Sequence, residues 1–425
     1  MNTYINPDRS TWAELCLRPS SDNPVVRERV EKIIDRVKTG GDSELKALAR
    51  EIDKAEMDSF EVTPEEFAKA SAEVSQAVKD AIEAASANIR KFHEAQLPKP
   101  LEVETTNGVK CYQRPVPVQR VGLYIPGGTA PLFSTVLMLA IPAKVAGCPE
   151  LILCTPARGG KVSSEVLYAA QQCGIDRVFK IGGAQAVAAM AFGTESVPKV
   201  DKIFGPGNQY VTTAKQLLGG KAVAIDMPAG PSEVMVMADS TAVPSFVAAD
   251  LLSQAEHGAD SQVMLVCDSA GIASKVSEEV ERQTEALGRR AFVEQSLSKS
   301  RAVVLGTREE MTAFANAYGA EHLIISMSDP WSIVDRITAA GSIFVGNWSP
   351  ESAGDYASGT NHTLPTCGWA RAFSGVNIDS FIRKITCQEL SREGLSSLSG
   401  TIVTMAEAEG LSAHANAVKV RIAND

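Results

Sequence analysis

Histidine is scarce in this chain, and four of the five histidines share a short segment with a carboxylate or an amide side chain. The first such segment is LSQAEHG at residues 252–258, in which Gln254 and His257 stand three residues apart. On a helix this spacing puts both side chains on one face, where they could hold a divalent cation. Glutamine is an unusual zinc ligand, so the spacing alone favours a histidine that caps the helix C-terminus.

A carboxylate and an imidazole are adjacent at Glu321 and His322, directly before the apolar run at residues 323–326. Two bases of different intrinsic strength are suited to moving protons during catalysis. Neighbouring strand residues point to opposite faces, so the pair can cooperate only if the chain bends where the strand begins. An exposed Glu-His pair in front of a strand is an equally good interpretation of the motif by itself.

The glycine-rich stretch SAGDYASGTNHTLP at residues 352–365 contains Asp355, Tyr356 and His362. It lies in a segment, residues 347–376, that is rich in Gly, Ser, Asn and Pro and is predicted to be a long functional loop. A carboxylate and an imidazole on such a loop could reach a metal from outside a sheet. Turn capping by Asp355 beside an exposed His362 is an equally open alternative.

The last carboxylate-histidine segment is EAEGLSAHAN at residues 407–416, which contains Glu409 and His414. These groups could complete a site if the C-terminal segment docks on another surface, although a solvated helix start explains the segment by itself. The fifth histidine, His93, lies in the polar helical stretch 89–96, and we expect it on a solvated face.

Together these segments supply one candidate set of metal ligands. Two histidines, one aspartate and one glutamine offer mixed nitrogen and oxygen donors, a set that suits Zn²⁺ and is also compatible with Mn²⁺ or Co²⁺. The sequence therefore predicts a divalent-metal site beside a pair of proton-transfer groups.

Three glycine-containing loops follow predicted strands: YIPGG at 124–128, IGGAQ at 181–185 and FGPGN at 204–208. Strand ends are where doubly wound sheets bind ligands, and glycine lets a ligand approach the backbone closely. Neither the G-x-G-x-x-G fingerprint nor a G-x-x-x-x-G-K-[ST] loop is present. Each loop alone is consistent with a tight turn, but three together predict a nucleotide-binding crevice.

Alternating patterns of strands and helices must position these residues. Residues 23–95 have helical periodicity, with Val30, Ile33, Ile34 and Val37 on one face. The predicted strands are residues 121–125, 151–155, 177–181, 202–204, 233–238, 262–268, 301–305, 322–326 and 342–345, with helices at 163–172 and 185–192 among the connections.

The pattern predicts an α/β protein with two Rossmann-like parallel-sheet domains of the incomplete dinucleotide-binding type and small terminal helical or arm segments. We expect an N-terminal arm at residues 1–22 and a Rossmann-like nucleotide-side domain at residues 121–235. A discontinuous catalytic domain is expected at residues 23–120 plus 236–376. Residues 377–425 are too few for a core of their own and are expected to form an arm that docks elsewhere.

Composition excludes several classes of partner. The chain has 425 residues, 44% of them hydrophobic and 22% charged, and a net charge of −10. An acidic surface argues against nucleic acid and anionic membranes as partners, and the apolar run at 136–142 is too short to span a bilayer. The start MNTYINPDRS does not resemble a signal peptide. The eight scattered cysteines favour free, structural thiols in the cytoplasm.

Long stretches of this chain resemble the histidinol dehydrogenase family, from about residue 25 to the end. They include RVGLYIPGGTAPLFSTVLMLAIPAKVAGC, KIGGAQAVAAMAFGT, DKIFGPGNQYV, IDMPAGPSEV, DLLSQAEHGADSQ, AEHL, SAGDYASGTNHTLPT and EAEGLSAHANAV. The resemblance implies an enzyme that oxidises L-histidinol to L-histidine by way of L-histidinaldehyde. Each substrate molecule would consume two NAD⁺, and each subunit would hold one Zn²⁺.

The resemblance also implies the role of each candidate residue. The implied zinc ligands are Gln254, His257, Asp355 and His414. The implied acid-base pair is Glu321 and His322, and the implied substrate contacts are Ser232, His322, His362, Glu409 and the zinc ligands. The implied NAD contacts are Tyr124, Gln185 and Asn208. A homodimer is implied in which Glu409 and His414 enter the site of the second copy.

Other functions remain open at this point. An enzyme on the same scaffold could oxidise another polar alcohol, such as a sulfonated diol. A zinc hydrolase could use Glu321 to activate water, and a metabolite-binding protein would need no acid-base pair. We expect histidinol as the substrate, because the carboxylate of Glu409 can receive an imidazole ring.

Overall fold

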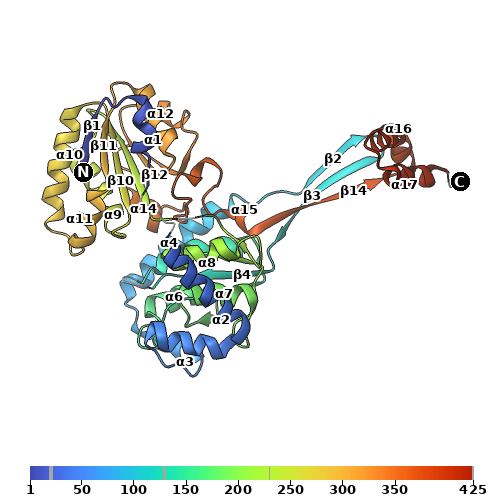
Figure 1. The fold of residues 1–425 in the computed structure, drawn as a ribbon, viewed down its shortest axis with the longest axis horizontal. Helices are drawn as coiled ribbons and strands as arrows, with labels where there is room; N and C mark the ends of the chain where they lie inside the picture. The colour runs from blue at the N-terminus through green and yellow to red at the C-terminus, as the bar shows by residue number, and fades with distance from the viewer. Residues whose placement is uncertain (19–22, 128–130, 229, 424–425) are drawn as a thin grey trace.

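The computed structural model describes residues 1–18, 23–127, 131–228 and 230–423. Figure 1 shows two α/β lobes and an arm that projects away from them and carries the C-terminal helices. Each lobe is built on one parallel sheet, which confirms the predicted fold class. No helix of the described residues is long and apolar enough to cross a membrane.

The first lobe, which we call the six-stranded lobe, contains a fully parallel sheet. In spatial order its strands are β1 (Asn2–Ile5), β11 (Arg301–Val304), β10 (Gln262–Cys267), β9 (Glu233–Ala238), β12 (Ala320–Ser326) and β13 (Ala340–Val345). Strand β9 is buried on both faces of the sheet. Val234 and Val236 pack on one face, and Met235 and Met237 pack on the other. A strand covered on both faces is continuously apolar.

The second lobe, which we call the five-stranded lobe, also has a parallel sheet. In spatial order its strands are β6 (Val178–Phe179), β5 (Glu150–Cys154), β4 (Arg120–Tyr124), β7 (Lys202–Phe204) and β8 (Ala224–Ile225). Numbered along the chain, these strands have the order three-two-one-four-five. Strands β9 to β13 of the other lobe have the same order, with β1 added beside the third. All nine predicted strands are present, with ends that shift by one or two residues.

Helices cover both faces of each sheet. Around the five-stranded sheet lie α2 (Pro24–Leu48), α3 (Pro64–Glu73), α4 (Gln76–Glu94), α5 (Phe133–Val145), α6 (Ser164–Gln172), α7 (Gly183–Phe192) and α8 (Gln209–Leu218), with the turn η2 (Ala49–Asp53) after α2. The six-stranded lobe contains η1 (Arg9–Thr11), α1 (Trp12–Leu15), α9 (Pro244–Ala255), α10 (Ala270–Thr284), α11 (Arg290–Ser298), α12 (Arg308–Tyr318), α13 (Trp331–Val334), α14 (Glu351–Tyr356) and η3 (Trp369–Arg371).

Residues 23–95 pack differently from the predicted domain division. Residues 23–95 are helical as predicted, but they cover the five-stranded sheet: Val30 and Leu45 lie in a core with Ile152, and Ile82 and Ile89 lie in one with Val121. The prediction had joined them to residues 236–376. Periodicity identified the apolar helix faces but could not identify the sheet that buries them.

The predicted N-terminal arm at residues 1–22 is also different, because residues 1–18 belong to the six-stranded lobe. Strand β1 pairs in parallel with β11 at the sheet edge. Trp12 of α1 is buried and stacks edge-on against Phe314, with ring centres 5.2 Å apart. This polar segment therefore adds a strand and a helix to an existing core.

His93 corrects another prediction, since it is 0% exposed and does not lie on a solvated face. It continues the buried stripe of α4 that includes Ile82, Ala85 and Ile89. Its ring Nδ1 lies 2.7 Å from the carbonyl oxygen of Ile89. The polar neighbours of His93 are on the outer face of the helix, so local composition was misleading here.

The projecting arm consists of a twisted antiparallel sheet with two helices at its end (Figure 1). Its strands are β14 (Ile382–Leu390), β3 (Val109–Pro117) and β2 (Leu101–Thr106), and the helices are α16 (Arg392–Ala408) and α17 (Ser412–Ala423). The short helix α15 (Ile378–Phe381) attaches the arm to the five-stranded lobe, where Phe381 stacks on Phe204 with ring centres 4.2 Å apart. This third sheet was not predicted from the sequence.

Candidate metal and acid-base site

Glu321 and His322 lie at the amino end of β12, at the start of the six-stranded sheet. Helix α12 ends at Tyr318, and Gly319 has a left-handed backbone (φ 65°) that turns the chain directly into the strand. A residue with a side chain would be strained in that conformation. Glu321 and His322 are 5% and 4% exposed. The alternative of an exposed surface pair therefore does not hold.

The two side chains meet beside the start of β9. Nδ1 of His322 lies 3.6 Å from Oε2 of Glu321 and 3.4 Å from the carbonyl oxygen of Glu233. The backbone N–H of Glu233 donates to Oε2 of Glu321 at 2.9 Å. Glu321 and His322 can act together, although they are sequence neighbours, because they lie where strand β12 begins.

Two helix C-termini that pack against each other carry three of the four predicted metal ligands. Helix α9 ends at Ala255 and carries Gln254 in its last turn, with the exposed His257 just beyond it. Helix α14 packs against α9 and carries Asp355 one residue before its end. Oδ1 of Asp355 lies 3.5 Å from Nε2 of His322. The predicted long loop at 347–376 therefore contains a short helix, and Asp355 is on it.

Glu351 also belongs to this cluster and was not predicted from the sequence. Ligand atoms of His257, Glu351 and Asp355 all lie within 4.8 Å of one another. Glu351 is 1% exposed, and its Oε1 is 4.0 Å from Nδ1 of His322. The available signal was its spacing: Glu351 and Asp355 are four residues apart, which puts two carboxylates on one helix face.

Several polar atoms in this cluster are buried without a hydrogen-bond partner in the described part of the chain. They are both amide atoms of Gln254, both carboxylate oxygens of Glu351 and Nε2 of His322. Gln254 is 0% exposed. A buried polar group without a partner costs about 1–3 kcal/mol, so several at one point indicate a site built for a ligand.

The pKa values of several side chains in this cluster are shifted from their ordinary values. Burial alone would lower the pKa of His322, but the carboxylates of Glu351, Glu321 and Asp355 raise it well above its ordinary value. Burial raises the pKa of Glu351 well above its ordinary value. Burial alone would raise the pKa of Asp355, but contact with His322 lowers it. Perturbed titratable groups that share one site are typical of catalytic centres.

A divalent cation fits this arrangement. The cluster offers imidazole nitrogen, amide oxygen and carboxylate oxygen, the donors that Zn²⁺ binds in catalytic sites. A bound cation would satisfy the partnerless amide oxygen of Gln254 and the carboxylate oxygens of Glu351. The partial negative charge at the C-termini of α9 and α14 favours a cation as well.

His362 and Ser232 lie near this cluster in different roles. The ring Nδ1 of His362 is 2.9 Å from the carbonyl oxygen of Asp355, and Nε2 is 3.2 Å from Oγ1 of Thr135 on α5. His362 therefore links helix α14, which carries Asp355, to the five-stranded lobe. Ser232 is half-buried and directly precedes Glu233, the residue that contacts both members of the acid-base pair.

Tyr124, Gln185 and Asn208 lie in the other lobe, at the carboxyl ends of the strands. The hydroxyl of Tyr124 accepts from the N–H of Gly183 at 3.1 Å, and burial raises its pKa to about 12. Gln185 is buried and donates to Asp53 at 3.3 Å. Asn208 is exposed and caps the start of α8 through the N–H groups of residues 210 and 211. Residues 128–130 of the first glycine loop lie outside the described residues.

The structure does not bring Glu409 and His414 to the cluster. Both are exposed and lie where α16 meets α17, at the tip of the arm (Figure 1). Within one chain, the four ligands that the resemblance implies are thus divided into three residues at the ends of α9 and α14 and one residue on the arm.

Comparison with known proteins identifies the family to which this arrangement belongs. The sequence model described as histidinol dehydrogenase matches residues 16–422. The chain belongs to the histidinol dehydrogenase family. It is 55% identical over 417 residues to the histidinol dehydrogenase of Bacteroides fragilis strain YCH46, covering 98% of this chain and 97% of that one. It is 54% identical over 411 residues to that of Salmonella typhimurium, covering 96% and 94%.

A solved structure agrees. The crystal structure of histidinol dehydrogenase from Elizabethkingia anophelis matches this chain with a TM-score of 0.97 and 50% identity, covering 99% of this chain and 98% of that one. As a member of the histidinol dehydrogenase family, the protein is an oxidoreductase of histidine biosynthesis.

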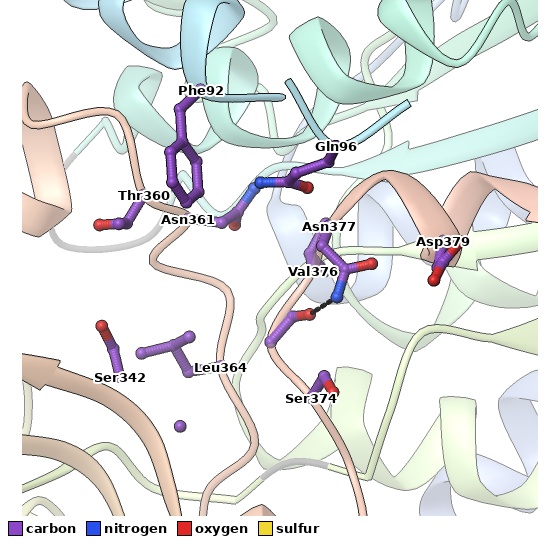
Figure 2. A pocket seen from close by; sticks show the side chains of 12 residues that line it. Phe92, Gln96, Ser342, Thr360, Asn361, Leu364, Ser374, Val376, Asn377 and Asp379 are labelled. Carbon is purple, nitrogen blue, oxygen red and sulfur yellow. Dashed lines mark hydrogen bonds between the residues drawn. The ribbon is translucent and has the colours of Figure 1, made fainter. Parts of the chain in front are cut away.

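One cavity of this histidinol dehydrogenase family member is lined by residues of both lobes. Its volume is about 430 Å³, and Figure 2 shows its lining, which includes Phe92, Gln96, Ser342 and Asn377. Three side-chain amides of the lining make hydrogen bonds within the chain, although Oδ1 of Asn377 is buried without a partner in the described residues. Gln96 accepts from the N–H of residue 378, Asn361 donates to the carbonyl oxygen of residue 138, and Asn377 donates to that of residue 375.

The cysteines of this family member contain no obvious nucleophile. Cys367 is closest to the site, on a segment beside Gly230, where a Cβ would meet its sulfur at 2.5 Å. Burial raises the pKa of the Cys367 thiol to about 11, which keeps it protonated near neutral pH. All eight cysteines are free.

Proposed function

We propose that this protein catalyses the four-electron oxidation of L-histidinol to L-histidine through L-histidinaldehyde, with Zn²⁺ and two NAD⁺. Membership of the histidinol dehydrogenase family supports the substrate. The observation that carries the chemistry is the buried pair Glu321 and His322 beside a cluster of partnerless nitrogen and oxygen donors. Proton transfer and metal binding are the two requirements of such an oxidation.

Gln254, His257 and Asp355 would hold the zinc ion, with His414 from a second copy. When bound, Zn²⁺ supplies a charge that fixes the amine and imidazole of the substrate and so orients the carbinol carbon. Glu351 is close enough to this group to tune or share the cation, since its carboxylate is within 4.8 Å of the ligand atoms of His257 and Asp355.

The protein's own side chains would carry the protons. In its neutral form, which the charge of a bound Zn²⁺ nearby would favour, His322 accepts the hydroxyl proton of the alcohol in the first oxidation, and it acts as base again when the hydrated aldehyde is oxidised. Glu321 activates the water that attacks the aldehyde. The hydrogen bond from the N–H of Glu233 orients the Glu321 carboxylate for that role.

The nucleotide would bind at the carboxyl ends of β4, β6 and β7, near Tyr124, Gln185 and Asn208. When bound, NAD⁺ supplies the hydride acceptor for each half of the reaction. Support comes from the strand order of this sheet, whose switch point lies between β4 and β7. Nucleotides bind at switch points in doubly wound sheets, even where the fingerprint is missing.

The arm supports a homodimer with shared sites. It exposes apolar side chains away from either lobe: Leu101 (53%), Val103 (44%), Ile385 (44%), Met405 (60%), Leu411 (44%) and Val420 (43%). Apolar groups gathered on a projecting arm indicate a docking surface. A second copy that covers it would receive Glu409 and His414 in its own site.

The test is NADH production from histidinol with and without a chelator. We expect two NADH per histidinol and loss of turnover after zinc is removed. Turnover of a sulfonated diol but not of histidinol, or NAD-independent hydrolysis, would contradict the proposal.

Two variants separate the roles within the site. Glu321→Gln should slow aldehyde oxidation more than alcohol oxidation, and equal losses would refute the assigned division of work. His414→Ala should release zinc, and mixing it with a His322 variant should restore part of the activity in hybrid dimers. No recovery would argue against a shared site.

A further inference from the structure

The N-terminal segment reaches the acid-base pair indirectly, through the side chain of Arg18. Nε of Arg18 donates to Oε2 of Glu233 at 2.8 Å, and Nη2 donates to Oε1 at 2.9 Å. The two side chains are 12% and 1% exposed. Two parallel bonds between planar groups fix the orientation of both partners as well as their separation.

Glu233 in turn contacts both catalytic groups through its backbone. Its N–H donates to Glu321, and its carbonyl oxygen lies beside Nδ1 of His322. As the first residue of β9, Glu233 pairs with Gln262 of β10, but the register with β12 begins one residue later, at Val234. The backbone of Glu233 is thus held by a ladder on one side only, and the Arg18 ion pair adds a second anchor.

Arg18 is itself immobilised and has its donors occupied. Nη2 also donates to the carbonyl oxygen of Tyr318 at 2.7 Å, and Nη1 donates to that of Cys16 at 3.0 Å. The guanidinium carbon lies 3.5 Å from the centre of the Tyr318 ring. Each guanidinium nitrogen already donates to a protein atom, so Arg18 is not placed to bind substrate.

We propose that Arg18 is a positioning residue for catalysis: through its ion pair with Glu233, it holds the backbone that orients Glu321 and His322. This inference rests on the proposed function of that pair. It gives the N-terminal segment a role, because β1 and α1 anchor the chain that delivers Arg18 to the amino end of the sheet.

The central experiment compares Arg18→Met with the double variant Arg18→Met/Glu233→Gln. The single change leaves a buried carboxylate without a partner, which lowers stability. The double change removes that charge and should restore the melting temperature. We expect kcat to stay about 10- to 100-fold below wild type in both, with KM for histidinol and NAD⁺ within about twofold, because a displaced base slows the chemical step.

The matched control is Arg308→Met. Arg308 pairs with Asp239 at the opposite end of β9, at 3.2 Å, and Asp239 is likewise buried. This variant should lose some stability and retain wild-type kcat. Arg18→Lys, which keeps the charge but cannot form the bidentate pair, should be intermediate.

The outcomes separate this inference from the proposed function. If wild-type protein makes no NADH from histidinol, the proposed function fails first. If wild type is active and the double variant regains full kcat together with its melting temperature, Arg18 has only a structural role and the inference is overturned. If Arg18→Met does not fold, the kcat and melting temperature of the double variant and of Arg18→Lys are compared with those of wild type in the same way.

Discussion

The two parallel sheets have the same strand order, yet their candidate functional residues gather at opposite ends. In the five-stranded lobe, Tyr124, Gln185 and Asn208 follow the carboxyl ends of the strands. In the six-stranded lobe, Glu321, His322 and the metal-ligand cluster lie at the amino ends. The helices between parallel strands run the opposite way, so the two ends differ in electrostatic character.

At the carboxyl end of a parallel sheet, helices begin, and their free N–H groups favour anions such as a nucleotide pyrophosphate. At the amino end, helices finish, and their free carbonyl groups favour cations. The last turn of α9 carries Gln254, and that of α14 carries Asp355. One topology thus offers an anion site and a cation site, and the proposed nucleotide and zinc sites take one from each sheet.

The two ends also differ in how completely their polar groups are paired. At the carboxyl end, Tyr124 and Gln185 have protein partners, whereas Gln254 and Glu351 at the amino end have none in the described residues. The amino end is therefore organised for a ligand at some cost in stability. This difference can be tested by mutation.

The largest effect is expected from His322→Gln. Loss of the shared base should lower kcat for both the alcohol and the aldehyde by about 10³-fold. Measurement of NADH formation from histidinol and from histidinaldehyde checks this. His93→Gln, a change at a buried histidine of the other lobe, is the control and should leave kcat unchanged. Equal activity of the two variants would break the assignment of chemistry to the amino end.

Lys215→Met should have the next largest effect, at the carboxyl end. Nζ of Lys215 lies 2.5 Å from Asp226, both are buried, and Nζ also donates to the carbonyl oxygen of Gly205 in the third glycine loop. Removing one partner of a buried pair costs about 3–5 kcal/mol of unfolding free energy. We also expect a higher KM for NAD⁺ with little change in kcat.

Denaturant unfolding and steady-state kinetics measure these two consequences of Lys215→Met. The control is Arg120→Met, which breaks an exposed pair with Asp201 in the same sheet and should cost less than about 1 kcal/mol. A lower kcat at unchanged KM for NAD⁺ would show that the loop does not serve the nucleotide.

Asp250→Asn sharpens the comparison through pH. Asp250 is on α9, and burial raises the pKa of its carboxyl to about 7, above the usual 3.8. The folded state therefore keeps this proton longer than the unfolded chain, and the group reduces stability as pH rises from about 4 to about 7. In metal-free protein, Asp250→Asn should gain roughly 2 kcal/mol over wild type between pH 5 and pH 7. A stability difference that does not change with pH would contradict this assignment.

The smallest effects are expected on the unfolding free energy, with opposite signs for an amide at the amino end of the six-stranded sheet and one at the carboxyl end of the five-stranded sheet. In metal-free protein, Gln254→Met is expected to raise the unfolding free energy by about 1 kcal/mol, because it removes a buried amide without partners. Gln185→Met should lower it by about 1 kcal/mol, because it breaks the hydrogen bond to Asp53. Zinc binding should weaken only in the first variant. Changes of the same sign would indicate that the two amides have equivalent surroundings.

Much of the local structure was predictable from the sequence. The run of residues 233–238 is apolar at every position after Glu233 and is a central strand, and the helical stripe of Val30, Ile34 and Val37 is buried as predicted. His93 was predicted wrongly because its immediate neighbours are polar, although the stripe through Ile82 and Ile89 reaches it. Periodicity along the whole helix was the better guide.

Local spacing determined which side chains could act together: Gln254 with His257, Glu321 with His322, and, unnoticed, Glu351 with Asp355. The last two relations follow from the start of a strand and the repeat of the helix, which the sequence alone specifies, whereas His257 lies just beyond the end of α9. Only the tertiary structure decided that all three pairs meet at one end of one sheet, and that Arg18 reaches Glu233 across more than 200 positions of sequence. Distant segments are brought together by strand order and packing, and no local pattern encodes that proximity.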